Sequence, residues 1–286
     1  MIYGLFAALG WGLADFFAHL ASRRLGSLMA VLIGQVLAVV AITAIFLASG
    51  YGVSSLDGWW WLVAINGVVA MSAYALHYHA LELGPVSVVS PIGAGYAVVG
   101  VLLAIAVLGE RPSALAFVGI GCSIVGAVLV STDLTAMRAG LRQHPPGLWW
   151  AVASAVGFGV AGFTLGVISQ KTGLWQVATF ASRWAMVIAF VPLATARRGE
   201  FSRLRTATML GVTFALIAGA TDVLGVASYS AGAENGSLSI VLAASAVFPL
   251  IAVLLSHLTL HERLATNQYV GIAFVVLGLL MLGLGS

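Results

Sequence analysis

The stretch GWGLADF at residues 10–16 recurs 147 residues later in the chain as GFGVAGF at residues 157–163. A second stretch, ELGPVS at residues 82–87, recurs at an offset of 152 residues as ENGSLS at residues 234–239. Matches at a nearly fixed offset are typical of a chain that contains copies of one structural unit. The sequence therefore predicts a duplicated fold, in which the second half of the chain repeats the first.

The composition of the chain excludes a soluble protein. Of its 286 residues, 61% are hydrophobic and 7% are charged, whereas soluble domains have about 45–50% apolar and about 25% charged residues. A disordered chain is also excluded, because such chains are poor in apolar residues. The single cysteine forms no disulfide framework, and no basic run interleaved with aromatic residues indicates a nucleic-acid partner. What remains is an integral membrane protein surrounded by membrane lipids.

Apolar runs of about 20 residues, each long enough to span a membrane as a helix, account for most of the sequence. Ten such runs, five in each copy, are expected at residues 3–22, 27–49, 59–81, 86–108, 113–131, 147–169, 174–196, 208–231, 236–260 and 266–284. Because five is an odd number, the second copy starts on the opposite side of the membrane, and the two copies are inverted. Inverted repeats are typical of transporters that expose a midplane site to each side in turn.

The predicted fold class is therefore an all-α integral membrane protein, with ten transmembrane helices arranged as two inverted five-helix repeats around a central cavity. We expect a first repeat at residues 1–135, a connecting loop at 136–146 and a second repeat at 147–286.

Several of these features together resemble one known family. They are the five-plus-five spans, GWGLADFF at 10–17, HALELGPVSVVSPI at 79–92 and the Gly-Glu-Arg at 109–111 that closes the fourth span. In this order the chain is similar to the EamA family of the drug/metabolite transporter superfamily, over essentially its whole length. The resemblance implies a helical bundle around a central cavity that exports or exchanges small metabolites, amino acids among them. It does not name the substrate.

The basic residues predict which side of the membrane faces the cytoplasm. Only Arg111 and Lys171 lie on the side that holds both termini. The other side holds nine arginines: Arg23, Arg24, Arg138, Arg142, Arg197, Arg198, Arg203, Arg205 and Arg263. Because short cytoplasmic loops carry an excess of Lys and Arg, we expect both termini outside the cytoplasmic (inner) membrane.

Ionisable residues inside the spans are candidate functional residues, because burying a charge in the bilayer is costly. On the first span Trp11, Asp15 and His19 are spaced by four residues and share one helix face. We expect Asp15 to contact substrate or a proton, and His19 to lie on the same face. The structural alternative is that Asp15 pairs with an arginine and that His19 lies near the lipid headgroups.

The seventh and eighth spans carry Arg183 and Asp222, and Tyr229 lies on the same face as Asp222. We expect one of the two aspartates, Asp15 or Asp222, to neutralise Arg183, since an unpaired buried guanidinium is the costlier state. The other carboxyl group is then left to titrate, which predicts proton coupling at Asp15 or Asp222. Whether the ion pair is structural or part of a gate stays open.

Aromatic residues are the predicted walls of the substrate site. Tyr74, His77 and Tyr78 lie on one face of the third span, although Tyr and His near a span end also form the usual interfacial belt. Tyr96 aligns with Phe248 in the other copy, and Phe158 aligns with Trp11.

The fourth and ninth spans are expected to be interrupted helices, with Pro91 and Pro249 as kink points. Helices broken at corresponding places in two halves are a sequence pointer to a transport site. The Glu-Arg pairs at 110–111 and 262–263 are expected to cap helix ends at the interface.

These features predict a secondary transporter, and not an enzyme, that exports or exchanges small amphipathic metabolites such as amino acids by alternating access, with proton coupling. The predicted substrate-binding residues are Trp11, Asp15, His19, Tyr74, His77, Tyr78, Tyr96, Phe158, Arg183, Asp222 and Tyr229. No metal or other cofactor is expected, and the chain is expected to be a monomer or a homodimer. The alternatives are a lipid or lipid-carrier flippase on the same fold and a membrane-embedded enzyme, for which no catalytic constellation is present in the sequence.

Overall fold

Helices make up every regular element that the computed structural model describes, over residues 1–83, 86–134, 137–138, 147–196, 208–260 and 264–285. In the first copy these are α1 (Ile2–Leu25), α2 (Ser27–Ser49), a short 3-10 helix η1 (Val53–Leu56), α3 (Trp60–Leu83), α4 (Val86–Ala94), α5 (Tyr96–Leu108) and α6 (Ala114–Ser131). In the second they are α8 (Leu148–Thr172), α9 (Trp175–Ala196), α10 (Met209–Asn235), α11 (Leu238–Ser245), α12 (Phe248–Leu260) and α13 (Thr266–Gly285).

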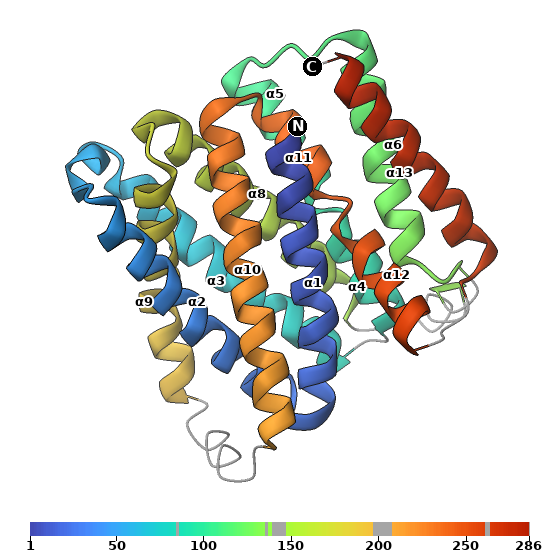
Figure 1. The fold of residues 1–286 in the computed structure, drawn as a ribbon, viewed down its shortest axis with the longest axis horizontal. Helices are drawn as coiled ribbons and strands as arrows, with labels where there is room; N and C mark the ends of the chain where they lie inside the picture. The colour runs from blue at the N-terminus through green and yellow to red at the C-terminus, as the bar shows by residue number, and fades with distance from the viewer. Residues whose placement is uncertain (84–85, 135–136, 139–146, 197–207, 261–263, 286) are drawn as a thin grey trace.

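The predicted spans are confirmed in the described residues. Nine helical stretches are long and apolar enough to cross a membrane, and α9 adds a shorter apolar stretch over Trp175–Val191. Both termini lie at the same end of the bundle (Figure 1). We call this end the terminal side, and we call the opposite end, where α1 finishes with Arg23 and Arg24, the arginine side.

The fourth and ninth spans are interrupted, as expected, but not at the prolines. Helix α4 runs through Pro91 and ends one turn later, with Gly95 between it and α5. In the second copy Ala246 and Val247 separate α11 from α12, and Pro249 lies in the first turn of α12. A proline is tolerated there, because the first N–H groups of a helix have no partner within the helix. The predicted kink points were therefore displaced from the actual breaks by about one turn.

The crossing of α6 with α13 demonstrates that the two repeats are inverted. These helices are the fifth spans of the two copies. A Cβ atom added to Gly119 would lie 2.9 Å from the carbonyl oxygen of Gly278, and one added to Gly126 would lie 2.8 Å from that of Gly271. As the residue number increases along α6, the number of the contacted residue on α13 decreases, so the two helices are antiparallel. Equivalent helices of the two copies therefore point in opposite directions, and small residues let their backbones touch.

The two repeats interleave. The first helix of each repeat packs on the third helix of the other, so that α1 lies along α10 (Figure 1) and α8 lies along α3. The glycines of the duplicated motif make these approaches possible: Gly10 meets the backbone of Gly225, and its equivalent Gly157 meets Ala73. Gly12 approaches the carbonyl oxygen of Phe248 in the same way as Gly159 approaches that of Tyr96. Residues related in this way, by 147 positions in the first spans and 152 in the third to fifth, are called counterparts below.

Candidate transport cavity

A cavity of about 450 Å³ lies between the two repeats. Every described α-helix except α11 and α13 contributes to its lining. The lining reaches toward the arginine side, where it includes Ala18 and Ser131, and it also includes Gly93 and Ala94 at the break between α4 and α5. Their counterparts Ser245 and Ala246, at the break between α11 and α12, are fully buried. The cavity thus extends from the middle of the bundle toward the arginine side.

Nine of the predicted substrate-binding residues line this cavity: Trp11, Asp15, Tyr74, His77, Tyr96, Phe158, Arg183, Asp222 and Tyr229. His19 is exposed near the end of α1 and does not belong to the lining. Tyr78 lies in α3, but its side chain is outside the part of the chain that the structure describes.

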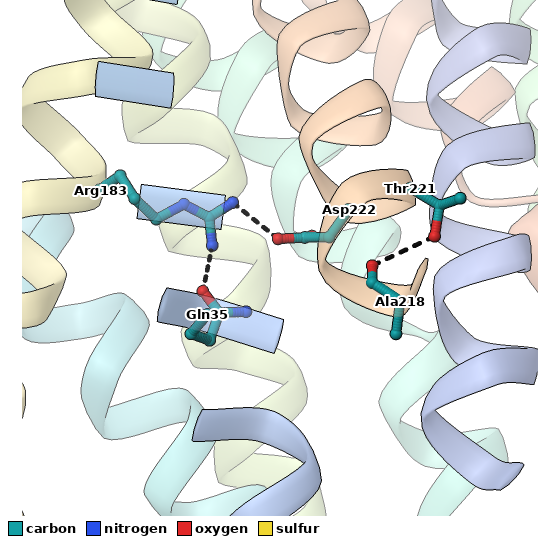
Figure 2. Close-up of polar contacts among 5 residues, drawn as sticks. All are labelled: Gln35, Arg183, Ala218, Thr221 and Asp222. Atoms are coloured by element: carbon teal, nitrogen blue, oxygen red, sulfur yellow. Dashed lines mark hydrogen bonds and ion pairs between the residues drawn. The ribbon is translucent and has the colours of Figure 1, made fainter. Parts of the chain in front are cut away.

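An ion pair between Arg183 of α9 and Asp222 of α10 is the charged centre of the cavity wall (Figure 2). Arg183 Nη2 donates to Asp222 Oδ2 at 3.0 Å, and Nη1 donates to Gln35 Oε1 of α2 at 2.7 Å. Only 8% of the arginine side chain and 15% of the aspartate side chain are exposed. The expectation that an aspartate neutralises Arg183 is confirmed, and the partner is Asp222.

Gln35 was not among the predicted site residues. The signal was present in the sequence, since Gln35 is the one amide in a long apolar span, and a polar side chain at membrane depth is a candidate for function. Thr221, the residue before Asp222, turns its hydroxyl to the carbonyl oxygen of Ala218, at 3.1 Å, and so bonds to its own helix (Figure 2).

Asp15 is the second carboxyl group in the cavity, and its situation differs from that of Asp222. Its side chain is exposed to the cavity. Among the described residues, no ion pair or hydrogen bond engages it. Trp11, one helical turn before Asp15, lies beside it in the lining, with its ring centroid 5.6 Å from that of Tyr229. A carboxyl group next to an aromatic face is an arrangement that binds cationic groups.

Aromatic rings form the remaining walls in related pairs. Phe158 lies edge-on to Tyr74, with ring centroids 4.9 Å apart, and 6.0 Å from the ring of His77. Phe158 is the counterpart of Trp11 and His77 is the counterpart of Tyr229, so the contacts of Trp11 with Tyr229 and of Phe158 with His77 are the same contact in the two repeats.

Two tyrosine hydroxyls bond to the protein and not into the cavity. Tyr229 Oη donates to the carbonyl oxygen of Gly162 at 2.8 Å, and Tyr96 Oη lies 3.3 Å from Ser245 Oγ. Asn66, also in the lining, donates from Nδ2 to Ala161 O and to Thr164 Oγ1, at 2.7 and 2.8 Å. These bonds tie α10 and α3 to α8, and α5 to α11.

Glu110 caps a helix of the other repeat, as the sequence predicts for this residue. Its carboxylate accepts hydrogen bonds from the backbone N–H groups of Leu238 and Ser239, at 2.7 and 3.0 Å, and from Ser237 Oγ at 2.8 Å. It therefore holds the N-terminus of α11, all of whose residues are buried. The second predicted pair, Glu262 and Arg263, lies outside the described residues.

In the part of the chain that the structure describes, no three His, Cys, Asp or Glu side chains lie close enough together to hold a metal ion.

Comparison with known proteins agrees with this architecture. A crystal structure of another protein superposes with a TM-score of 0.76 over 99% of this chain and 96% of its own, at 16% sequence identity, which shows the shared fold. A probable terminal-alkyne amino-acid exporter of Streptantibioticus cattleyicolor is 28% identical over 223 residues, which are 77% of this chain and 72% of that protein. An uncharacterised protein of Methanocaldococcus jannaschii is 27% identical over 133 residues, which are 46% of this chain and 92% of that protein.

The EamA-like transporter family matches residues 1–132 and again residues 145–284. The match therefore extends over both inverted repeats and all the helices that line the cavity. The chain is a multi-pass membrane protein whose substrate is a small molecule, and the family that it matches is not a family of enzymes. It belongs to the EamA-like transporter family.

Proposed function

We propose that this protein is a secondary transporter that exports or exchanges small amphipathic metabolites, amino acids among them, by alternating access. The observation that carries the proposal is the cavity between the two inverted repeats, which combines aromatic walls with a neutralised ion pair and an additional carboxyl group at Asp15. The similarity to the probable terminal-alkyne amino-acid exporter of Streptantibioticus cattleyicolor supports the same class of substrate.

The charges of the cavity suggest how such a solute binds. Arg183 and Asp222 neutralise each other, so Asp15 is the group whose charge remains to be balanced. An ammonium group bound between Asp15 and the ring of Trp11 balances it, and the apolar part of the solute contacts Tyr74 and Phe158. The guanidinium group has five N–H donors, of which the bonds to Gln35 and Asp222 use two. The remaining donors are available to the carboxylate of an amino acid.

Proton coupling follows from the same charge balance. A proton on Asp15 neutralises that carboxyl group as an ammonium group does, so a proton and a cationic solute exclude each other at this position. Asp222 is less suited to this role, because it is already engaged in the ion pair with Arg183. We therefore assign the coupling primarily to Asp15.

The arginine side is proposed to face the cytoplasm, with both termini outside the cytoplasmic membrane, since short basic loops are retained there. In this orientation the cavity extends toward the cytoplasm, from which an exporter loads its substrate. A reporter that works only outside the cytoplasm is expected to give a signal when it is fused to either terminus.

A lipid-linked phosphate suits the cavity less well. A phosphate carries more negative charge than the carboxylate of an amino acid and brings no ammonium group for Asp15, while the charge of Arg183 is already balanced by Asp222.

Flux in liposomes tests the proposal. Purified protein is reconstituted with a pH gradient, and uptake of radiolabelled apolar amino acids is measured for the wild type, for Asp15→Asn and for Asp57→Asn. Asp57 is an exposed carboxylate in the connection between α2 and α3 and serves as the matched control. We expect Asp57→Asn to retain the wild-type rate and Asp15→Asn to lose proton-driven flux. A wild-type rate in Asp15→Asn contradicts the role of Asp15, and absence of flux of any tested amino acid in the wild type contradicts the substrate class.

A further inference from the structure

Most helix contacts in the bundle occur twice, once for each repeat. The packing of α1 on α10 is matched by α3 on α8, that of α1 on α12 by α5 on α8, and that of α2 on α10 by α3 on α9. The packing of α1 on α11 is likewise matched by that of α4 on α8. A pseudo-twofold relation therefore governs the scaffold, and any contact made in one repeat alone marks a difference between the two sides of the membrane.

Several such differences exist among the described residues, including the contacts of α6 with α11 and with α12. Three others involve helices around the cavity. Helix α10 packs on α8 and on α9, and α11 packs on α5. Among the described residues, the equivalent pairs, α3 with α1, α3 with α2 and α4 with α12, make no comparable contact. The residues that would face one another across these gaps line the cavity: Asp15, Ala18, Gln35, His77, Gly93 and Phe248. The cavity is thus the space left where contacts that close the terminal side are missing on the arginine side.

In an alternating-access cycle the two repeats exchange these arrangements, since each can adopt the conformation of the other. The opposite state then has α3 closed against α1 and α2, and α10 withdrawn from α8 and α9. One of the contacts that join α10 to α8 is the hydrogen bond from Tyr229 Oη to Gly162 O. The counterpart of Tyr229 is His77, and the counterpart of Gly162 is Asp15.

We propose that His77 and Asp15 form a gate pair that closes the arginine side in the opposite state. This proposal rests on the proposed alternating-access function and identifies His77 as a positioning residue of the cycle. Both side chains already line the cavity, on the facing helices α3 and α1.

The side-chain lengths on the two sides are complementary. Tyr229 is long and reaches the backbone of Gly162, where an added Cβ atom would lie in van der Waals contact, 3.6 Å from Tyr229 Oη. On the other side the shorter imidazole of His77 would face Asp15, whose carboxyl group extends from α1 to meet it. An imidazole N–H donating to a carboxylate oxygen is also the stronger bond, because the acceptor is charged.

The gate pair provides a way to release the solute when the two repeats exchange their conformations. In the state described here, Asp15 is accessible to an ammonium group or a proton from the arginine side. When α3 closes on α1, the imidazole takes this position and competes with the ammonium group for the carboxylate, while the terminal side opens. Binding of the solute and formation of the gate pair thus exclude each other, because both use the carboxyl group of Asp15.

Two matched pairs of spin labels report the two sides independently. Cys122 is replaced by Ala, and labels are attached at Arg24→Cys with Leu83→Cys on the arginine side, or at Lys171→Cys with Asn235→Cys on the terminal side. All four positions are exposed, and the two pairs are counterparts of each other. Pulsed dipolar spectroscopy on the full chain in lipid nanodiscs is expected to give two distances at each pair, with the short distance at 24–83 occurring together with the long distance at 171–235.

The gate pair predicts how substitutions shift these populations. A net hydrogen bond to a charged group is worth roughly a tenfold or larger change in a two-state ratio, so we expect His77→Phe and Asp15→Leu each to lower the ratio of the short to the long 24–83 population about tenfold. The double variant is expected to match the single ones, because the two side chains act as one contact. His77→Gln retains an N–H donor and is expected to retain most of the population. Tyr229→Phe, which removes the equivalent bond on the terminal side, is expected to shift the ratio in the opposite direction.

The outcomes separate the gate pair from the proposed function. Two distances in the wild type that respond to neither His77→Phe nor Asp15→Leu overturn the gate pair and leave alternating access standing. Additive effects of the two substitutions also overturn it. A single distance at both label pairs in the wild type overturns alternating access itself, and the gate pair with it.

Discussion

Arg183 and Asp222 form an ion pair of 3.0 Å between two neighbouring helices of the second repeat, α9 and α10. The pair has no equivalent in the first repeat, since the counterpart of Asp222 is Ala70. It joins α10 to α9 in the wall of the cavity, and in the proposed function it leaves Asp222 unavailable to a cationic solute. The pair therefore stabilises the packing of α10 on α9, and in the proposed function it leaves Asp15 as the acidic group for a cationic solute.

Removal of one member of this pair is expected to destabilise the protein. In Asp222→Asn the guanidinium group of Arg183, 8% exposed, loses its counter-charge, and breaking a buried ion pair costs about 3–5 kcal/mol. The double variant Arg183→Met with Asp222→Leu buries no charge and is expected to recover most of this loss without recovering transport. Thermal unfolding in detergent measures the stability, and an unfolding temperature of the single variant equal to that of the wild type contradicts the assignment.

The sequence predicted the spans and the duplication because both depend on local composition, but it did not determine which partner neutralises Arg183. Asp15 and Asp222 lie at similar depth in the membrane, and either was compatible with the pattern. The choice follows from the packing within the second repeat, which places α10 directly on α9, whereas α1 makes no comparable contact with α9 among the described residues. Gln35 was missed for the same reason, since its role depends on α2 approaching α9.

His19 illustrates the limit of the helical-face argument. Its spacing from Trp11 and Asp15 does place it on their face of α1. The cavity lining on α1, however, ends at Ala18, and His19 is exposed. Face periodicity predicts direction around a helix axis, whereas the extent of a cavity along that axis depends on the helices opposite. The helix breaks at Gly95 and at Ala246 likewise lie about one turn from the prolines, because the sequence pattern predicted their position along the helix axis only approximately.

The cap on α11 is expected to contribute to closure of the terminal side. Glu110→Ala removes the acceptor for two backbone N–H groups at a buried helix start, and the loss of an N-terminal cap costs about 1–2 kcal/mol. We expect a lower unfolding temperature and faster labelling of a cysteine placed at Ser239 with a water-soluble maleimide. Glu110→Gln retains one oxygen acceptor and is expected to be intermediate, whereas equal labelling of all three proteins contradicts a role in closure.

The antiparallel contact of α6 with α13 is expected to tolerate no additional methyl group at its centre. In Gly126→Ala the new Cβ atom would lie 2.6 Å from the backbone nitrogen of Val275 and 2.8 Å from the carbonyl oxygen of Gly271. Overpacking of this kind costs about 1–3 kcal/mol. Gly121, five residues earlier on α6, has no atom within 4 Å of an added Cβ, so Gly121→Ala is the matched control and is expected to leave the unfolding temperature unchanged or to raise it. Similar losses in both variants would show that helix flexibility, and not the contact, limits stability.

Ligand-induced stabilisation is expected to depend on the amino group of the solute. A ligand at 100 times its Kd stabilises the folded state by about 2.7 kcal/mol, which raises the unfolding temperature measurably. Three probes separate the two ends of an amino acid: phenylalanine carries both charged groups, phenethylamine lacks the carboxylate, and 3-phenylpropionate lacks the amino group. If Asp15 binds the ammonium group, phenylalanine and phenethylamine stabilise the wild type and phenylpropionate does not, and Asp15→Asn loses the difference. Stabilisation by phenylpropionate alone would instead place recognition at Arg183, whose remaining donors are the groups in the cavity suited to a carboxylate.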